Sequence, residues 1–147
     1  AIDQDFPDPD VLATGDGYFA FATNAGPVNV QVAWSRDLES WQVRRVDALP
    51  NPGAIVVVPH QDEPFVSILL TRKGETIAAF RNKCPHAGYP LQRADGRVLV
   101  QEGRYMVCSA HGASFALETG ACAGGPCNGD ALERIAVEVR DGAVFSA

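Results

Sequence analysis

The chain has 147 residues, 46% of them hydrophobic, which suits one domain with its own core or one small domain with an appendage. Its net charge is −6, with 12 Lys and Arg against 18 Asp and Glu, so the clustered positive charge that nucleic acids require is missing. No run approaches 18 consecutive apolar residues and no basic leader precedes a hydrophobic region, so we expect no membrane span and a cytoplasmic location.

Residues 1–41 contain two runs that are rich in aromatic and β-branched side chains. These runs are Tyr18–Thr23 and Val28–Trp34, and the Asn24–Pro27 segment between them holds turn-forming residues. A β-hairpin is therefore predicted for this N-terminal segment.

The order of residues from Asp5–Asp10 to Asp37–Trp41 resembles the first blade of the five-bladed β-propeller glycosidases. That resemblance implies a fused or recombined segment in which Asp8 occupies the position of the general base. Glycosidic cleavage also needs a second carboxyl group, which that family takes from a later blade, and no later blade follows in the sequence. We therefore expect no glycosidase activity, with Asp8 as a turn or cap residue.

An isolated hairpin is only marginally stable in water, so the aromatic side chains of residues 1–41 need a partner. We expect this segment to add strands to the sheet of residues 42–147, or to pack against another subunit in a homo-oligomer. The alternative is a carbohydrate-binding module, which would require Trp34 or Trp41 in solvent.

Residues 42–147 form the predicted second domain, which begins near Trp41–Asp47 and the turn Pro50–Gly53. Several short β-type runs follow, separated by turns, one of which contains His60, and no stretch has a long helical period. The runs are Ala54–Val58, Phe65–Leu70, Thr76–Phe80, Tyr105–Val107 and the alternating segment Ile135–Arg140. This pattern predicts an all-β antiparallel sandwich or barrel.

Two short pieces of this domain hold two cysteines and two histidines. Cys84-Pro85-His86 and Cys108-Ser109-Ala110-His111 each contribute one thiolate and one imidazole. Four such ligands can hold a tetrahedral zinc ion or grip an iron–sulfur cluster from opposite sides. Zinc sites more often group Cys with Cys and His with His, so the tight Cys-x-His spacing favours the cluster.

The two pieces and the residues after them, Thr119–Gly120 and Gly124–Pro126, resemble the cluster-binding loops and proline loop of Rieske [2Fe–2S] proteins. The resemblance covers about residues 43–147. It implies a Rieske-type antiparallel β-sandwich or barrel with a cluster-binding subdomain and one [2Fe–2S] cluster. Carried over by position, it also implies that Cys84 and Cys108 bind one iron and that His86 and His111 bind the other.

The resemblance further implies a ferredoxin, a one-electron carrier rather than an enzyme, between a flavin-dependent reductase and a terminal oxygenase. An acidic surface suits docking onto a basic partner. An oxygenase catalytic subunit would need a 2-His-1-carboxylate triad, for which only His60 remains. The other alternative is the accessory subunit of a nitrite reductase, which shares the fold but often lacks the ligands.

The loop residues also predict the potential. By the same resemblance, Tyr89 and Ala110 stand where high-potential members carry a disulfide, and Ala113 and Phe115 stand where those members place hydroxyl donors. Fewer donors favour the oxidised cluster, so we predict a potential in the lower half of the Rieske range of about −150 to +300 mV. Ser114 provides one other route to such a hydrogen bond.

Cys122 and Cys127 lie five positions apart, around Gly124-Gly125-Pro126. They allow a third ligand pair, a local disulfide or two free thiols. Because a reducing cytosol disfavours a disulfide, we expect free thiols. Gly125 and Pro126 are predicted to form a third loop that covers the cluster.

Overall fold

The computed structural model describes residues 10–15, 17–25, 28–35, 41–59 and 67–146. These residues form fourteen β-strands and one short 3-10 helix, Val46–Ala48. No described helix is long and apolar enough to cross a membrane. The predicted all-β class is confirmed, whereas His60 and Asp8 lie outside the described residues.

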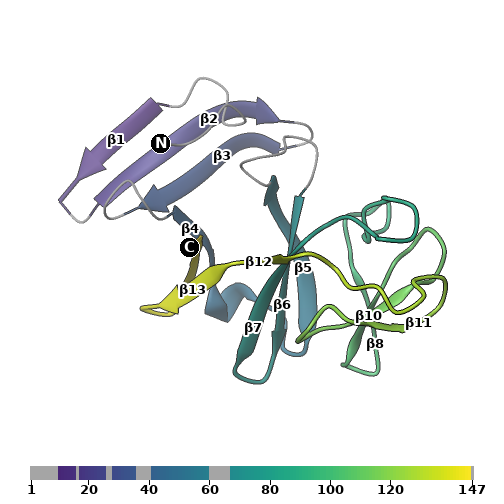
Figure 1. The fold of residues 1–147 in the computed structure, drawn as a ribbon. Coiled ribbons are helices and arrows are strands. Elements are labelled where there is room, and N and C mark those ends of the chain that lie inside the picture. Colours follow the sequence, from purple (N-terminus) through teal and green to yellow (C-terminus); the bar gives the residue numbers. More distant parts are fainter. Residues whose placement is uncertain (1–9, 16, 26–27, 36–40, 60–66, 147) are drawn as a thin grey trace.

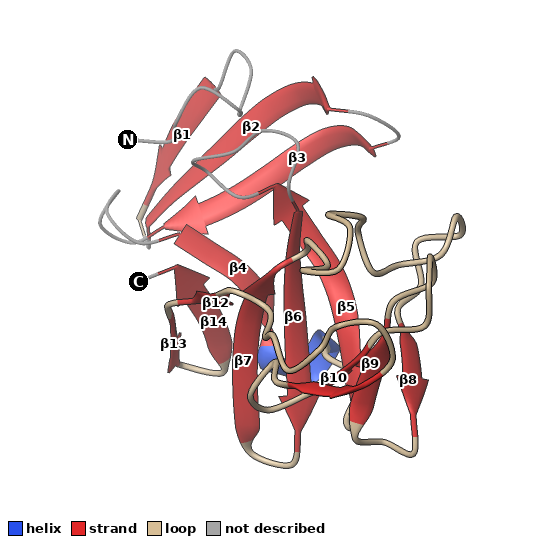
Figure 2. Ribbon diagram, turned by 45° about the vertical axis from the view of Figure 1, so that its right-hand side comes forward, coloured by secondary structure: helices blue, strands red, loops and turns tan. Residues whose placement is uncertain are grey.

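The strands form three antiparallel sheets (Figures 1 and 2). The first, six-stranded sheet has the order β1 (Asp10–Thr14), β2 (Gly17–Ala25), β3 (Val28–Ser35), β4 (Trp41–Arg45), β14 (Ala143–Ser146) and β13 (Val137–Arg140). The second, central sheet has the order β12 (Arg134–Ile135), β7 (Thr76–Arg81), β6 (Ser67–Lys73) and β5 (Gly53–Pro59). The third sheet has the order β11 (Cys122–Gly124), β10 (Ser114–Ala116), β9 (Tyr105–Val107) and β8 (Leu99–Gln101).

The predicted N-terminal hairpin is present as β2 and β3, and its strands continue the sheet that contains the C-terminal strands. Strand β3 pairs with β4 through Trp34 and Gln42, and Gln42 in turn pairs with Phe145 of β14. Figure 1 shows β1 to β3 on the side of the molecule away from β8 to β11. The side chains of Trp34 and Trp41 lie outside the described part of the structure, so the carbohydrate-binding alternative stays untested.

The central sheet is buried on both faces because successive side chains of a strand point to opposite sides. Leu69 and Phe80 face the core that also contains the loop cysteines. Leu70 and Ala79 face a second core, which they share with Val144 of β14. The central sheet is therefore the rigid layer between the six-stranded sheet and the half of the molecule that carries the cysteine and histidine motifs.

The single strand predicted over Ile135–Arg140 is wrong in one respect. The structure has two short strands here, β12 paired with β7 and β13 paired with β14, in different sheets. Val139, one of the apolar residues of this alternating segment, is 50% exposed. The large apolar side chains keep their spacing of two residues across Ala136, so no local pattern marks the place where the chain leaves one sheet for the other.

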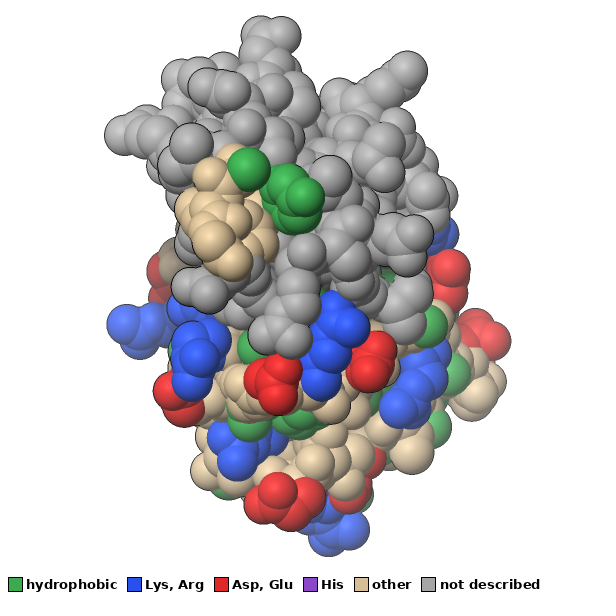
Figure 3. All heavy atoms as spheres, turned by 90° about the vertical axis from the view of Figure 1, so that its left-hand side faces the viewer, with side chains coloured by type: hydrophobic (Ala, Val, Ile, Leu, Met, Phe, Trp, Pro, Cys, Tyr) green, Lys and Arg blue, Asp and Glu red, His purple; other side chains and the backbone are tan. Residues whose placement is uncertain are grey.

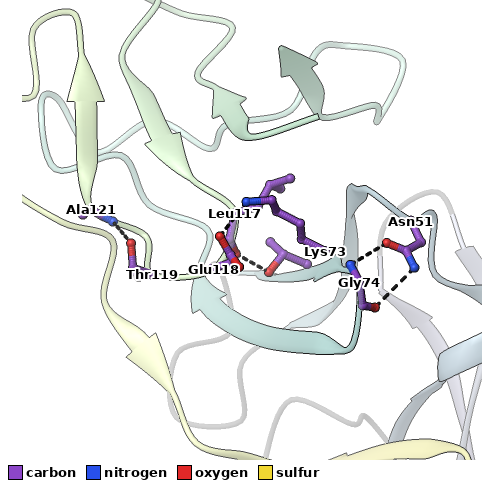
Figure 4. Close-up of polar contacts among 8 residues, drawn as sticks. Asn51, Lys73, Gly74, Leu117, Glu118, Thr119 and Ala121 are labelled. Carbon is purple, nitrogen blue, oxygen red and sulfur yellow. Dashed lines mark hydrogen bonds and ion pairs between the residues drawn. The ribbon is translucent and has the colours of Figure 1, made fainter. Parts of the chain in front are cut away.

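Polar contacts tie the central sheet to the third sheet. The buried Thr71 hydroxyl donates to the Leu117 carbonyl oxygen at 2.7 Å. Beside it, Lys73 Nζ lies 2.7 Å from Glu118 Oε2 (Figure 4). Because the Thr71 bond is buried, its loss would leave an unpaired carbonyl, and it therefore contributes more to this junction than the partly exposed ion pair.

Charges of both signs are mixed on the face shown in Figure 3, where Lys and Arg side chains alternate with Asp and Glu over the described lower half. The net charge of −6 therefore does not produce a single-sign patch on this face.

Candidate metal centre

Ligand loop 1, residues 84–89, is separated from the end of strand β7 by two residues. Its backbone is closed by two hydrogen bonds: the Cys84 amide donates to the Tyr89 carbonyl at 2.8 Å, and the Gly88 amide donates to the Cys84 carbonyl at 2.7 Å. Gly88 has φ +76°, a left-handed conformation that glycine adopts without a steric penalty. The tight turn brings Cys84 and His86 out of the same loop.

Ligand loop 2, residues 108–113, follows strand β9 and repeats this frame. The Cys108 amide donates to the Ala113 carbonyl at 2.8 Å, and the Gly112 amide donates to the Cys108 carbonyl at 3.0 Å. Gly112 also has φ +76°. The two loops thus share one backbone geometry, although the imidazole comes from the third position of loop 1 and the fourth position of loop 2.

The two thiols meet inside the protein. Cys84 and Cys108 are 2% and 1% exposed and lie next to each other in the same core. Burial raises the pKa of the Cys84 thiol, as does the neighbouring Cys108, whereas the amides of His86 and Ala87 act in the opposite direction. Deprotonation of the Cys84 thiol, which binding of a metal would require, is therefore disfavoured in this core.

The two imidazoles meet at the surface. His86 and His111 are both exposed, and their ring centroids lie 4.9 Å apart in an edge-to-face arrangement. The ring of Tyr89, itself 55% exposed, lies 5.8 Å from that of His111. The loops therefore place a nitrogen pair outside and a sulfur pair inside.

A single tetrahedral ion would need its ligands about 2.0–2.3 Å from one point. Within the described ranges, no three His, Cys, Asp or Glu side chains are grouped to hold one ion in this way. The four candidate ligands instead form a thiol pair and an imidazole pair. Two pairs suit a two-iron cluster in which each iron takes two protein ligands.

Asn82, just before ligand loop 1, is a positioning residue that sequence reasoning missed. Its side chain is buried, donates to Ser67 Oγ at 2.8 Å and to Gln92 Oε1 at 2.6 Å, and accepts from the Leu91 amide at 2.8 Å. These bonds tie both ends of the loop-1 segment to strand β6. In the sequence, an Asn before a loop is typical of any turn, so nothing local marks this role.

The third loop, residues 122–127, packs against ligand loop 2. Gly125 has φ +77°, and a Cβ at this position would lie 2.7 Å from the Gly112 carbonyl oxygen and 3.0 Å from Ala113 Cα. Only a glycine allows the two backbones to approach this closely. The close approach places the predicted third loop directly against the second ligand loop.

Cys122 and Cys127 form a disulfide, so the expectation of free thiols is wrong. The turn through Gly124 and Gly125 returns the chain and brings the two Cα atoms to 5.9 Å, within the range that a disulfide needs. The free cysteines of the structure are Cys84 and Cys108. A third ligand pair is thereby removed from the alternatives.

Fold and site together define a class, a small all-β domain whose paired loops can hold a metal cluster. The family model of the Rieske [2Fe–2S] domain matches residues 29–139, and the chain belongs to this family. Such a domain binds one [2Fe–2S] cluster. The match begins in β3, inside residues 1–41, so the resemblance of that segment to a propeller blade is not borne out.

Solved structures with the same fold include a chain of the complex of reduced oxygenase and oxidised ferredoxin in carbazole 1,9a-dioxygenase. It is 23% identical, with a TM-score of 0.60 over 74% of this chain and 92% of that one. The ferredoxin of carbazole 1,9a-dioxygenase from Nocardioides aromaticivorans IC177 is 21% identical, with a TM-score of 0.56 over 72% and 94%. The Sphingomonas yanoikuyae B1 ferredoxin is 24% identical, with a TM-score of 0.54 over 70% and 92%.

A putative small subunit of an NADPH nitrite reductase also has this fold, with 18% identity and a TM-score of 0.52 over 74% of this chain and 97% of that one. No curated protein sequence matched the chain. At these identities the likeness concerns the fold.

Proposed function

We propose that the chain is a one-electron carrier of the Rieske ferredoxin type, in which Cys84 and Cys108 hold one iron and His86 and His111 hold the other. When bound, the cluster supplies the uptake and release of a single electron. The observation that supports this proposal is the pairing of two buried thiols and two exposed imidazoles on loops with one common backbone frame.

The cysteines and the histidines would have different roles in such a carrier. The buried thiols keep the sulfur-ligated side away from water, and the strands that end in each loop hold the ligands in place. The exposed imidazoles form the side that a redox partner can approach closely.

We place this carrier in the cytoplasm, between a flavin-dependent reductase and a terminal oxygenase. One similar chain comes from a complex of a ferredoxin with an oxygenase, which supports the second partner. The nitrite reductase subunit has the same fold, but the four candidate ligands favour a carrier over an accessory subunit. The division into residues 1–41 and 42–147, and a homo-oligomer through the first segment, remain part of this proposal.

The proposal is tested by anaerobic purification or reconstitution, with iron, zinc and sulfide analysis and the electron paramagnetic resonance spectrum of the reduced protein. We expect iron and sulfide in equal amounts, a spectrum typical of mixed nitrogen and sulfur ligation, and oxidation of the reduced protein by a one-electron acceptor such as cytochrome c. Colourless protein after reconstitution, or protein that holds only zinc, would contradict the proposal.

The potential is expected in the lower half of the range of about −150 to +300 mV. Ala113 and Phe115 are fully buried and carry no hydroxyl, and the Ser114 hydroxyl donates to the Gly124 carbonyl at 3.3 Å. Ala113→Ser, which adds a donor at the end of ligand loop 2, should raise the potential by roughly 65–130 mV, since a bond to a charged group is worth about 1.5–3 kcal/mol and about 1.4 kcal/mol corresponds to 59 mV for one electron.

The matched control is Ser114→Ala, which removes a hydroxyl that already serves the main chain and should leave the potential nearly unchanged. Redox titration of the three proteins measures the effect. A wild-type potential in the upper half of the range, or no rise in Ala113→Ser, would refute the assignment of Ala113 to a donor position.

A further inference from the structure

The Cys122–Cys127 disulfide closes the third loop at the place where that loop touches ligand loop 2. Cys122 begins strand β11, which pairs with β10, and the loop then passes Gly125 before it returns to Cys127. Between these two anchors, Gly125 packs on Gly112 and Ala113, the residues that follow His111. The disulfide thus fixes both ends of the segment that lies against a candidate ligand loop.

The two cysteines of this disulfide differ in burial. Cys127 is 1% exposed and belongs to the same core as Cys84 and Cys108. Its sulfur lies 3.1 Å from the Gly124 carbonyl oxygen. Cys122 is only partly buried and packs at the edge of that core. An external thiol can therefore reach Cys122 more readily than Cys127.

We propose that Cys122–Cys127 is a reversible thiol–disulfide site that accepts electrons from a dithiol reductant and controls how firmly the third loop holds ligand loop 2. One thiolate of the reductant attacks Cys122 Sγ, the disulfide bond breaks, and Cys127 leaves as a thiolate that takes up a proton. The second thiol then attacks the mixed disulfide, which releases Cys122 as a thiol and oxidises the reductant to its own disulfide. Two electrons and two protons are transferred in all.

Reduction changes the constraint on the loop. With the disulfide closed, Gly125 is held against the Gly112 carbonyl; with it open, the segment between Cys122 and Cys127 loses its covalent closure and opens locally more often. Water then reaches the buried side of ligand loop 2, where Cys108 and Ala113 lie. The inference rests on the proposed cluster, and it suits the cytoplasm, where disulfides are usually redox-sensing rather than permanent.

The first test does not require a bound cluster. The protein is equilibrated anaerobically with mixtures of reduced and oxidised dithiothreitol, quenched in acid, alkylated and mapped by mass spectrometry. We expect Cys122 and Cys127 to be protected together in oxidising mixtures and to become labelled together as the mixture becomes reducing. Labelling of both cysteines in all mixtures, or protection of both even in fully reduced dithiothreitol, would overturn the reversible site.

The second test measures the rate at which cluster absorbance is lost. Reduced wild-type protein should lose it about fivefold faster than oxidised protein, because local opening then controls access to the centre. Cys122→Ser/Cys127→Ser should match the reduced protein and no longer respond to dithiothreitol, which also shows whether the reagent attacks the cluster directly.

Ala123→Ser, an exposed substitution in the same loop, is the matched control and should behave like wild type. Equal rates for oxidised and reduced wild-type protein would overturn the effect on ligand loop 2. Alkylation does not depend on iron, so the two proposals can fail separately. A protein that never binds a cluster would contradict the carrier proposal. The alkylation map would still show whether the disulfide is reversible.

Discussion

Replacing His86 or His111 with alanine should abolish the cluster or change its spectrum. Each substitution removes one of the two nitrogen ligands proposed for the iron that His86 and His111 share. Both rings are exposed, so neither change disturbs a buried core. A two-iron cluster with an open position is exposed to water and is expected to be lost, or to return with a different ligand and a different paramagnetic resonance spectrum. Iron content and that spectrum measure the effect.

The third histidine of the chain supplies a control with the same chemical change. His60 lies outside both motifs. The His60→Ala variant should therefore keep the iron content and the spectrum of the wild type. An unaltered spectrum in His86→Ala or His111→Ala would refute the assignment of that residue, whereas loss of the cluster in all three variants would point to general damage by histidine removal.

Asn82→Ala should lower the free energy of unfolding by about 3 kcal/mol, the largest effect we expect from a residue that is not a candidate ligand. The substitution removes three side-chain hydrogen bonds and leaves the buried Leu91 amide without its acceptor. For a chain of this size the midpoint of thermal unfolding should fall by roughly 6–12 °C. Because these bonds fix ligand loop 1, the rate of cluster loss should rise as well.

Asn51→Ala is the matched control for this prediction. Asn51 also makes side-chain hydrogen bonds, to the main chain of Gly74 at 2.8 and 3.2 Å, but it is exposed (Figure 4). Water can replace an exposed hydrogen-bond partner, so the free energy of unfolding should fall by at most about 1 kcal/mol. Chemical denaturation measures the free energy of unfolding of both variants. Equal decreases in the two variants would show that the burial of Asn82 does not strengthen its contribution to stability.

The ligand motifs were readable from the sequence because their geometry is local. Each loop closes within six residues, and Gly88 and Gly112 sit at the same position of the same hydrogen-bonded frame. Spacing along the chain therefore predicted which side chains share a loop. The short β runs were also recognised, since alternation and turn residues act over a few positions.

The disulfide and the role of Asn82 were not readable in this way. Whether Cys122 and Cys127 pair depends on the path of the turn between them and on its packing against Gly112. The partners of Asn82 lie up to 15 positions away, in β6 and after ligand loop 1. Free thiols were predicted from a general rule about the reducing cytosol. That rule takes no account of the turn, which brings Cys122 and Cys127 within bonding distance.

The sequence by itself determined the all-β class and the two matched loops with their four candidate ligands, because these depend on residues that are near neighbours in the chain. Only the tertiary structure decided that β4 joins β14, that the Ile135–Arg140 segment divides between two sheets, and that the third loop lies against ligand loop 2. Gln42 and Phe145, for example, are paired across most of the chain's length. Such pairings depend on which edges and faces remain to be covered once the local elements have formed, and no short pattern of residues encodes that competition.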